Sequence, residues 1–104
     1  SDCEGWRQEL LGVLRANRER VERTVSDLPG LCMGHVEATY LAWIDARGLG
    51  VESPCAYFEQ AGVGLSDGGD FGLPGWVRLN FGCAPELLEC ALQRMGEACH
   101  ARVK

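Results

Sequence analysis

The segment that most constrains the fold of this chain is TYLAWID, from Thr39 to Asp45. Its β-branched and aromatic residues follow one another in nearly unbroken apolar order, which predicts a β-strand. A strand without polar alternation needs cover on both faces of its sheet. The chain has 104 residues, which is room for one domain, so we expect helices of that same domain to pack on the sheet.

Helical periodicity occurs near both ends of the chain. Apolar residues recur at multiples of three to four from about Glu4 to Leu28, and Pro29-Gly30 ends this pattern. A second helix is predicted from Pro85 to about Arg102, and Ser53 is expected to cap a short one from Pro54 to about Gly62. The residues expected on the apolar faces are Trp6, Leu10, Leu14, Val21 and Val25 in the first helix and Leu88, Leu92, Met95 and Cys99 in the last.

Three further strands are predicted, at Leu31–Val36, at Val63–Leu65 and, most clearly, at Trp76–Phe81 with the sequence WVRLNF. The predicted order is α-β-β-α-β-β-α, an α+β fold in which helices pack on a small sheet. We interpret residues 1–104 as a single domain, with a long helix in residues 1–30 that leads into a sheet-and-helix core in residues 31–104.

Charge and hydropathy exclude several classes of protein. The chain has 15 acidic and 10 basic residues, so it lacks the basic excess that a nucleic-acid-binding module needs. Hydrophobic residues make up 46%, which argues against intrinsic disorder. No apolar run approaches the ~20 residues of a transmembrane helix, and no basic segment followed by an apolar one begins the sequence. We therefore expect a cytoplasmic domain that does not bind membranes.

The six cysteines do not follow a metal-binding pattern. No C-x-x-C pair occurs, and His35 and His100 stand far apart, so neither a zinc site nor a disulfide framework is favoured. We expect free thiols that behave as small buried hydrophobes in a reducing compartment. Neither histidine has an identifiable catalytic partner. The cysteines are Cys3, Cys32, Cys55, Cys83, Cys90 and Cys99.

A glycine-rich segment with two carboxylates, SDGGDFG from Ser66 to Gly72, precedes the WVRLNF strand. It lacks both common phosphate-binding glycine patterns, and a strand rather than a helix follows it. The spacing of its carboxylates also differs from that of a calcium loop. We interpret it as a surface turn between strands.

Arg78 is the most informative polar residue of the chain. It lies between Val77 and Leu79, and the two-residue period of a strand places it on one face with Trp76 and Asn80. Two interpretations follow from the residues alone. The guanidinium is either exposed to solvent, or it is partly buried and ready to bind an anion such as a carboxylate.

Three segments together resemble one known family. They are EATYLAWIDARGLG (37–50), YFEQAGVGLSDGGDFG (57–72) and GWVRLNFGCAPELLECALQRM (75–95). They resemble the C-terminal part of pyridoxal-phosphate enzymes of the aminotransferase class I/II superfamily, in particular the cystathionine β-lyase-like C–S lyases. The opening helix, with WRQELLGVLRANRERV, is similar to the helix that leads into the small domain of those enzymes.

The resemblance implies that this chain is an isolated small domain. Members of the family are several times longer, form homodimers, and carry on their large domain the lysine that binds pyridoxal phosphate. The only lysine here is the last residue, Lys104, so we expect the chain alone to hold no cofactor and to be inactive. The arginine of the V-R-L-N-F pattern falls on Arg78, which implies that Arg78 binds the α-carboxylate of the amino-acid substrate. No catalytic, cofactor-binding or metal-binding residue is expected in this chain, and the loop Ser66–Gly72 is expected near the mouth of the active site.

The activity implied for the full-length enzyme is β-elimination from sulfur amino acids, which releases pyruvate, ammonia and a thiol. Two alternatives stay open. The first is the small domain of an aminotransferase, which would share Arg78. The second is an interaction module without a catalytic partner. In a small domain the surface that meets the missing large domain should be apolar, and Leu11 and Val13 lie outside the main apolar face of the first helix.

Overall fold

The computed structural model describes residues 2–102, with the side chains of residues 2–4, 6 and 7 left aside. In chain order the elements are α1 (Asp2–Asp27), β1 (Cys32–Glu37), β2 (Leu41–Asp45), α2 (Pro54–Gln60), β3 (Ser66–Asp67), β4 (Trp76–Asn80) and α3 (Pro85–Arg102). Two 3₁₀ turns, η1 (Arg47–Leu49) and η2 (Gly68–Phe71), lie between them. This confirms the predicted α+β class and the order α-β-β-α-β-β-α.

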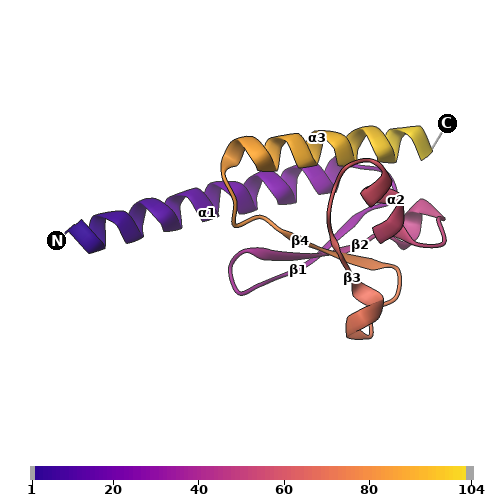
Figure 1. Cartoon of the computed structure of the whole chain (residues 1–104), viewed down its shortest axis with the longest axis horizontal. Coiled ribbons are helices and arrows are strands. Elements are labelled where there is room, and N and C mark those ends of the chain that lie inside the picture. Colours follow the sequence, from indigo (N-terminus) through magenta and orange to yellow (C-terminus); the bar gives the residue numbers. More distant parts are fainter. Residues whose placement is uncertain (1, 103–104) are drawn as a thin grey trace.

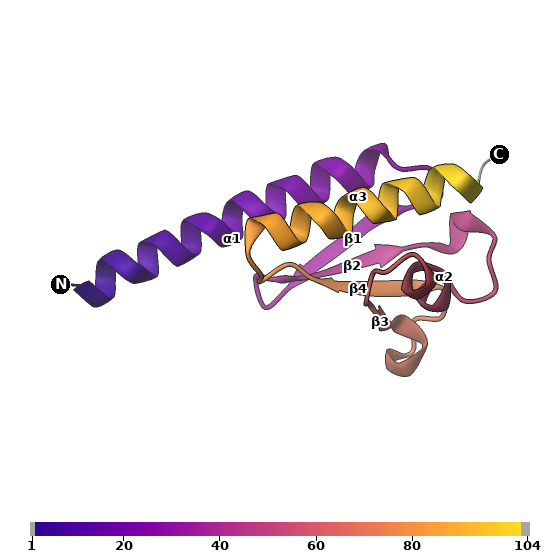
Figure 2. The same cartoon turned by 45° about the horizontal axis from the view of Figure 1, so that its top comes forward.

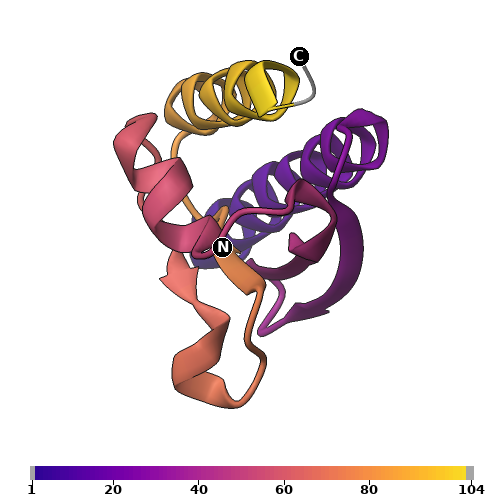
Figure 3. The same cartoon turned by 90° about the vertical axis from the view of Figure 1, so that its right-hand side faces the viewer.

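The four strands form one antiparallel sheet in the order β1-β2-β4-β3. Helices α1 and α3 run side by side on one face of this sheet, and α2 lies at the edge near β3 (Figures 1 and 2). The η2 turn lies on the side of the sheet away from α1 and α3 (Figure 3). Within residues 2–102, no helix is long and apolar enough to cross a membrane.

The hydrophobic core lies between the sheet and the two long helices. Alternate residues of β4 point into it, since Val77 and Leu79 are buried there and Phe81, just after the strand, is fully buried. This confirms the two-residue period predicted for WVRLNF. From β2, Ala42 and Ile44 enter the same core, whereas Trp43 is buried outside it. Strand β2 is therefore covered on both faces, as its apolar sequence predicts.

Only part of the predicted apolar face of α1 is buried. On that face Val21 and Val25 are buried, Leu14 is half-buried and Leu10 is 41% exposed. Leu11 and Val13, which lie outside the face, are exposed as well. The reason is length, because a helix of 26 residues is roughly 39 Å long and a five-residue strand spans only about 17 Å. The first turns of α1 consequently project beyond the sheet (Figure 1). The side chain of Trp6 lies outside the described residues.

A buried amide fastens α1 to the rest of the domain. Asn17 is only 2% exposed, and its side-chain amide donates to the backbone carbonyls of Phe81 at 2.8 Å and Cys83 at 3.0 Å. These two hydrogen bonds join the middle of α1 to the connection between β4 and α3. Asn17 lies in a charge-rich stretch of the sequence, but it comes three residues after Leu14 and four before Val21, so helical periodicity places it on the apolar face of α1.

The prediction of a strand at Val63–Leu65 is wrong. The strand is the next segment, β3, whose residues Ser66 and Asp67 pair with β4. Val63 is buried in the core from the loop after α2, and its amide donates to the carbonyl of Phe58 at 2.9 Å. The apolar residues at 63–65 therefore belong to a loop that packs on the core.

The predicted start of β2 at Thr39 is also too early, because Thr39 belongs to the turn before it.

The turn between β1 and β2 has two residues in the left-handed region, Ala38 with φ 52° and Thr39 with φ 63°. Such turns favour Asn-Gly, and a β-branched residue is strained there. We expect Thr39→Gly to raise the free energy of unfolding by about 0.5–1 kcal/mol, measured by urea denaturation. Ala16→Gly, in an exposed part of α1, is the control and should lower it by about as much. A destabilising Thr39→Gly would contradict the strain argument.

Candidate functional site

Arg78 lies in the middle of β4, on the sheet face away from α1 and α3. It is paired in register with Trp43 of β2 and with Ser66 of β3, so regular backbone pairing holds it from both sides. The residue is half-buried, and its Nε is fully buried without a hydrogen-bond partner. The structure therefore differs from the interpretation of Arg78 as a plainly solvent-exposed strand residue.

Two aromatic rings surround the guanidinium of Arg78. Its Cζ lies 4.6 Å from the ring centre of Phe71 and 5.6 Å from that of Trp43. The two rings contact each other edge-on, with centres 5.5 Å apart and planes at 78°. These contacts are favourable for a cation, but they use none of its N–H donors.

No described carboxylate pairs with Arg78. Among the side chains that the structure describes, the ion pairs are Arg18–Glu22, Arg20–Glu89 and Arg47–Asp45, and all of them lie elsewhere. A guanidinium stays charged at any physiological pH and has five N–H donors in a planar fork. Arg78 can therefore accept a carboxylate or another planar anion without displacing an existing acidic partner.

The glycine-rich segment is more ordered than the predicted surface turn. After β3, the residues Gly68–Phe71 form the η2 turn, and the Asp67 carboxylate accepts a hydrogen bond from the Gly69 amide at 2.9 Å. Gly72 ends the turn with φ 80°. The segment thereby brings Phe71 onto Arg78, which explains its position next to the site. Sequence reasoning placed the loop near the site but did not identify Phe71.

Close packing explains one glycine of this segment. Gly68 is buried against β4, and a Cβ at this position would lie 2.6 Å from the carbonyl oxygen of Trp76. Because that neighbour is a backbone atom, any side chain would force the turn away from the sheet. The requirement for glycine here comes from this contact.

The two histidines lie in different surroundings. His35 of β1 is exposed and stacks on the outer side of Trp43, with ring centres 6.3 Å apart. His100, near the end of α3, has its Nδ1 2.8 Å from the carbonyl oxygen of Gly96. Neither contact forms an acid–base pair. His35 nevertheless belongs to the same row of side chains as Trp43 and Arg78, which the sequence did not indicate.

The prediction that the cysteines are buried holds only in part. Cys99 is fully buried and Cys55 and Cys83 are half-buried, but Cys32 and Cys90 are exposed. The side chain of Cys3 lies outside the described residues. All five described cysteines are free thiols, and the described side chains include no group of three or more His, Cys, Asp or Glu residues that could hold a metal ion.

Burial raises the pKa of the Cys99 thiol to about 11, so almost none of it is thiolate at pH 8. We expect a disulfide reagent at pH 8 to modify Cys32 and Cys90 rapidly and Cys99 only after unfolding. Absorbance of the released thiol measures this. Cys32→Ala and Cys90→Ala should each remove one fast equivalent, and Cys99→Ala should remove none. A fast equivalent lost in Cys99→Ala would contradict its burial.

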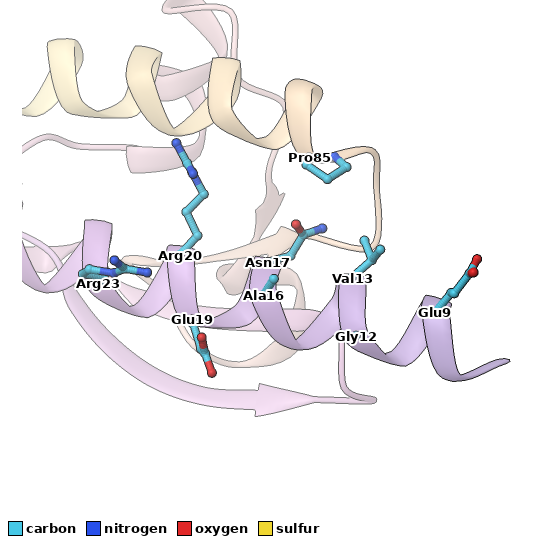
Figure 4. Close-up of a pocket in the computed structure, with 9 residues that line it drawn as sticks. All are labelled: Glu9, Gly12, Val13, Ala16, Asn17, Glu19, Arg20, Arg23 and Pro85. Carbon is cyan, nitrogen blue, oxygen red and sulfur yellow. The ribbon is translucent and has the colours of Figure 1, made fainter. Parts of the chain in front are cut away.

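A hollow lies between α1 and the start of α3 (Figure 4). Asn17 and Val13 of α1 point toward Pro85 across it, and Arg20 reaches toward α3, where it pairs with Glu89 at 2.7 Å. Of its polar side chains, Arg20 joins α1 to α3, and Asn17 joins α1 to the connection that precedes α3. The hollow lies on the helix side of the sheet and is separate from Arg78. Its lining residues are Glu9, Gly12, Val13, Ala16, Asn17, Glu19, Arg20, Arg23 and Pro85.

Comparison with known proteins gives consistent relatives, although no family model matches the chain. A cystathionine β-lyase from Corynebacterium glutamicum is 34% identical over 98 residues, which are 91% of this chain and 26% of the relative. The crystal structure of a protein named OvoB is 49% identical with a TM-score of 0.87, over 95% of this chain and 26% of OvoB.

A pyridoxal-phosphate-bound C–S lyase from Staphylococcus hominis is 29% identical with a TM-score of 0.79. This similarity covers 92% of the present chain and 25% of the lyase. The chain thus spans about a quarter of the length of the proteins that it matches.

Proposed function

The chain belongs to the family of pyridoxal-phosphate-dependent cystathionine β-lyases and class I aminotransferases, whose C-terminal portion it matches, and we propose that it binds the α-carboxylate of the amino-acid substrate of a C–S β-lyase. One observation carries this proposal. The guanidinium of Arg78 is half-buried between Trp43 and Phe71, has a buried Nε without a partner, and pairs with no described carboxylate.

The chemistry of Arg78 suits an α-carboxylate. A guanidinium and a carboxylate can form two parallel, charge-assisted hydrogen bonds, which fix direction as well as distance. The pairing of β4 with strands on both sides holds the backbone of Arg78 more rigidly than a loop would. Arg78 therefore acts by positioning, because a carboxylate held at two points leaves the rest of the amino acid little freedom to rotate.

The reaction proposed for the full-length enzyme is the elimination of the β-sulfur group. A sulfur amino acid and water would yield a thiol, pyruvate and ammonia. We favour this reaction because two of the relatives are a cystathionine β-lyase and a C–S lyase. Transamination is the second candidate, since an aminotransferase would need the same carboxylate contact.

The described residues do not by themselves fit pyridoxal phosphate. Residues 2–102 include no lysine, and Lys104 lies outside the described residues. We therefore place the cofactor on the rest of the protein and propose that this chain contributes the carboxylate site only. The exposed residues Leu10, Leu11 and Val13 of α1 suit a contact with that remaining part, with residues 1–30 as the linking helix and the full-length enzyme as a homodimer.

The test of this proposal uses the full-length protein. Pyruvate release from cystathionine without an added keto acid supports the lyase, whereas turnover that depends on a keto acid supports an aminotransferase. Mass analysis of the protein in its native source addresses the third alternative. A product of only 104 residues in the cell would favour a free-standing interaction module, and a longer polypeptide would exclude it.

A further inference from the structure

We propose that Phe71 is a positioning residue for the substrate carboxylate, because with Trp43 it forms an aromatic clamp that holds the guanidinium of Arg78. This inference rests on the proposed role of Arg78. It assigns to the glycine-rich segment before β4 a role in setting substrate affinity. The clamp is defined as the side chains of Phe71 and Trp43.

The contacts of the clamp use none of the N–H donors of Arg78. Both ring centres lie within 6 Å of its Cζ, and the ring planes meet at 78°, so the guanidinium lies in a corner of two aromatic faces. Buried arginines are commonly held by a carboxylate, which would occupy the same N–H donors that a substrate needs. An aromatic face attracts the cation through its π-electrons and leaves those donors unused.

We expect the clamp to orient the guanidinium of Arg78 before the substrate binds. A free arginine side chain has many rotamers, and their loss would weaken carboxylate binding. The clamp restricts the rotamers of Arg78 before the carboxylate binds, so fewer of them are lost on binding. Phe71 also covers part of the guanidinium from water, and lower hydration strengthens the attraction between the two charges.

The turn that carries Phe71 is fixed at both ends. At its start Asp67 binds the Gly69 amide, and at its end the amide of Gly72 donates to the carbonyls of Gly68 and Gly69. The amide of Leu73 adds a hydrogen bond to the carbonyl of Gly68 at 2.8 Å. The Phe71 side chain is 53% exposed, so its place over Arg78 follows from the turn and not from burial in the core.

Phe71 is also the better member of the clamp to vary. Trp43 is only 4% exposed, so its replacement would open a cavity and disturb β2. Three substitutions of Phe71 separate the possible contributions. Phe71→Tyr keeps an aromatic face, Phe71→Leu keeps apolar bulk without one, and Phe71→Ala removes both.

The experiment measures steady-state kinetics of the full-length enzyme, loaded with cofactor, on cystathionine. We expect Phe71→Leu and Phe71→Ala to raise KM about tenfold, with kcat changed less than about threefold. Phe71→Tyr should stay within about twofold of wild type. A binding readout accompanies the kinetics, because the dissociation constant of propionate, measured by calorimetry, should rise about tenfold in the same two variants. Propionate has a carboxylate but no amino group that could react with the cofactor.

The control is Leu87→Ala, which removes a 67% exposed apolar side chain from α3. Helix α3 itself lies on the face of the sheet opposite to Arg78 (Figure 1). It should leave KM and propionate binding unchanged. The inference is overturned if Phe71→Leu matches wild type, or if Phe71→Tyr is as weak as Phe71→Ala. Arg78→Ala separates a failure of the proposed carboxylate-binding role of Arg78 from a failure of the proposed role of Phe71. If Arg78→Ala leaves KM and propionate binding unchanged, the proposed function is wrong. If Arg78→Ala changes them strongly and Phe71→Leu does not, Arg78 keeps its proposed role and only the role of the clamp is wrong.

Discussion

Arg78→Ala is expected to lower kcat/KM for cystathionine about a hundredfold or more in the full-length enzyme. A hydrogen bond to a charged group contributes about 1.5–3 kcal/mol, and a guanidinium forms two such bonds with a carboxylate. Since about 1.4 kcal/mol corresponds to a factor of ten, the loss of both bonds reaches two decades or more. Arg78→Lys should recover only part of the activity, because an ammonium keeps the charge but lacks the planar fork.

Two controls accompany this measurement. The absorbance of the bound cofactor should be unchanged in Arg78→Ala, because we place the cofactor on another part of the protein. The free energy of unfolding should also change little, since Arg78 lies outside the hydrophobic core. A value of kcat/KM within about threefold of wild type would show that Arg78 is a surface residue of the strand and that its proposed role is wrong.

Phe81→Ala, unlike Arg78→Ala, is expected to lower the free energy of unfolding strongly. Phe81 is fully buried in the core, and truncation of a buried phenylalanine typically costs about 3–5 kcal/mol. Domains of this size are stable by about 5–15 kcal/mol in total, so the variant should lose a large fraction of its free energy of unfolding. Urea denaturation of the 104-residue chain measures the loss.

Phe71→Ala is the matched control for this prediction, because it removes the same side chain from a position that is 53% exposed. It should change the free energy of unfolding by less than about 1 kcal/mol. Equal losses in Phe71→Ala and Phe81→Ala would contradict the division of roles, in which Phe81 stabilises the core and Phe71 acts on Arg78.

Local periodicity was sufficient to predict most of the secondary structure. The alternation in WVRLNF separates Arg78 from the buried Val77 and Leu79, because side chains of a strand point to opposite faces whatever the rest of the fold is. The predicted ends of α3 match the observed ones, since Pro85 can begin a helix and the apolar period continues to its last turn. The resemblance to pyridoxal-phosphate enzymes supplied the interpretation of Arg78 itself.

Short segments without a period were predicted less well. The error at Val63–Leu65 arose because an apolar loop that packs on the core has the same composition as a short strand. Strand β3 has only two residues, Ser66 and Asp67, and exists because β4 offers an edge to pair with. Its position depends on a partner strand, which the local sequence does not specify.

The surroundings of Arg78 were decided by tertiary structure alone. Sheet pairing brings Trp43 next to Arg78 across the β2–β4 ladder, and the η2 turn folds Phe71 back over the guanidinium. Both contacts join residues from separate segments, and their ring geometry depends on how those segments pack. The sequence by itself thus determined that a lone arginine lies on the outer face of a buried strand. That this arginine has aromatic neighbours in place of a carboxylate, and so keeps its N–H donors unused, follows only from the pairing of β2 with β4 and the packing of η2 against the sheet.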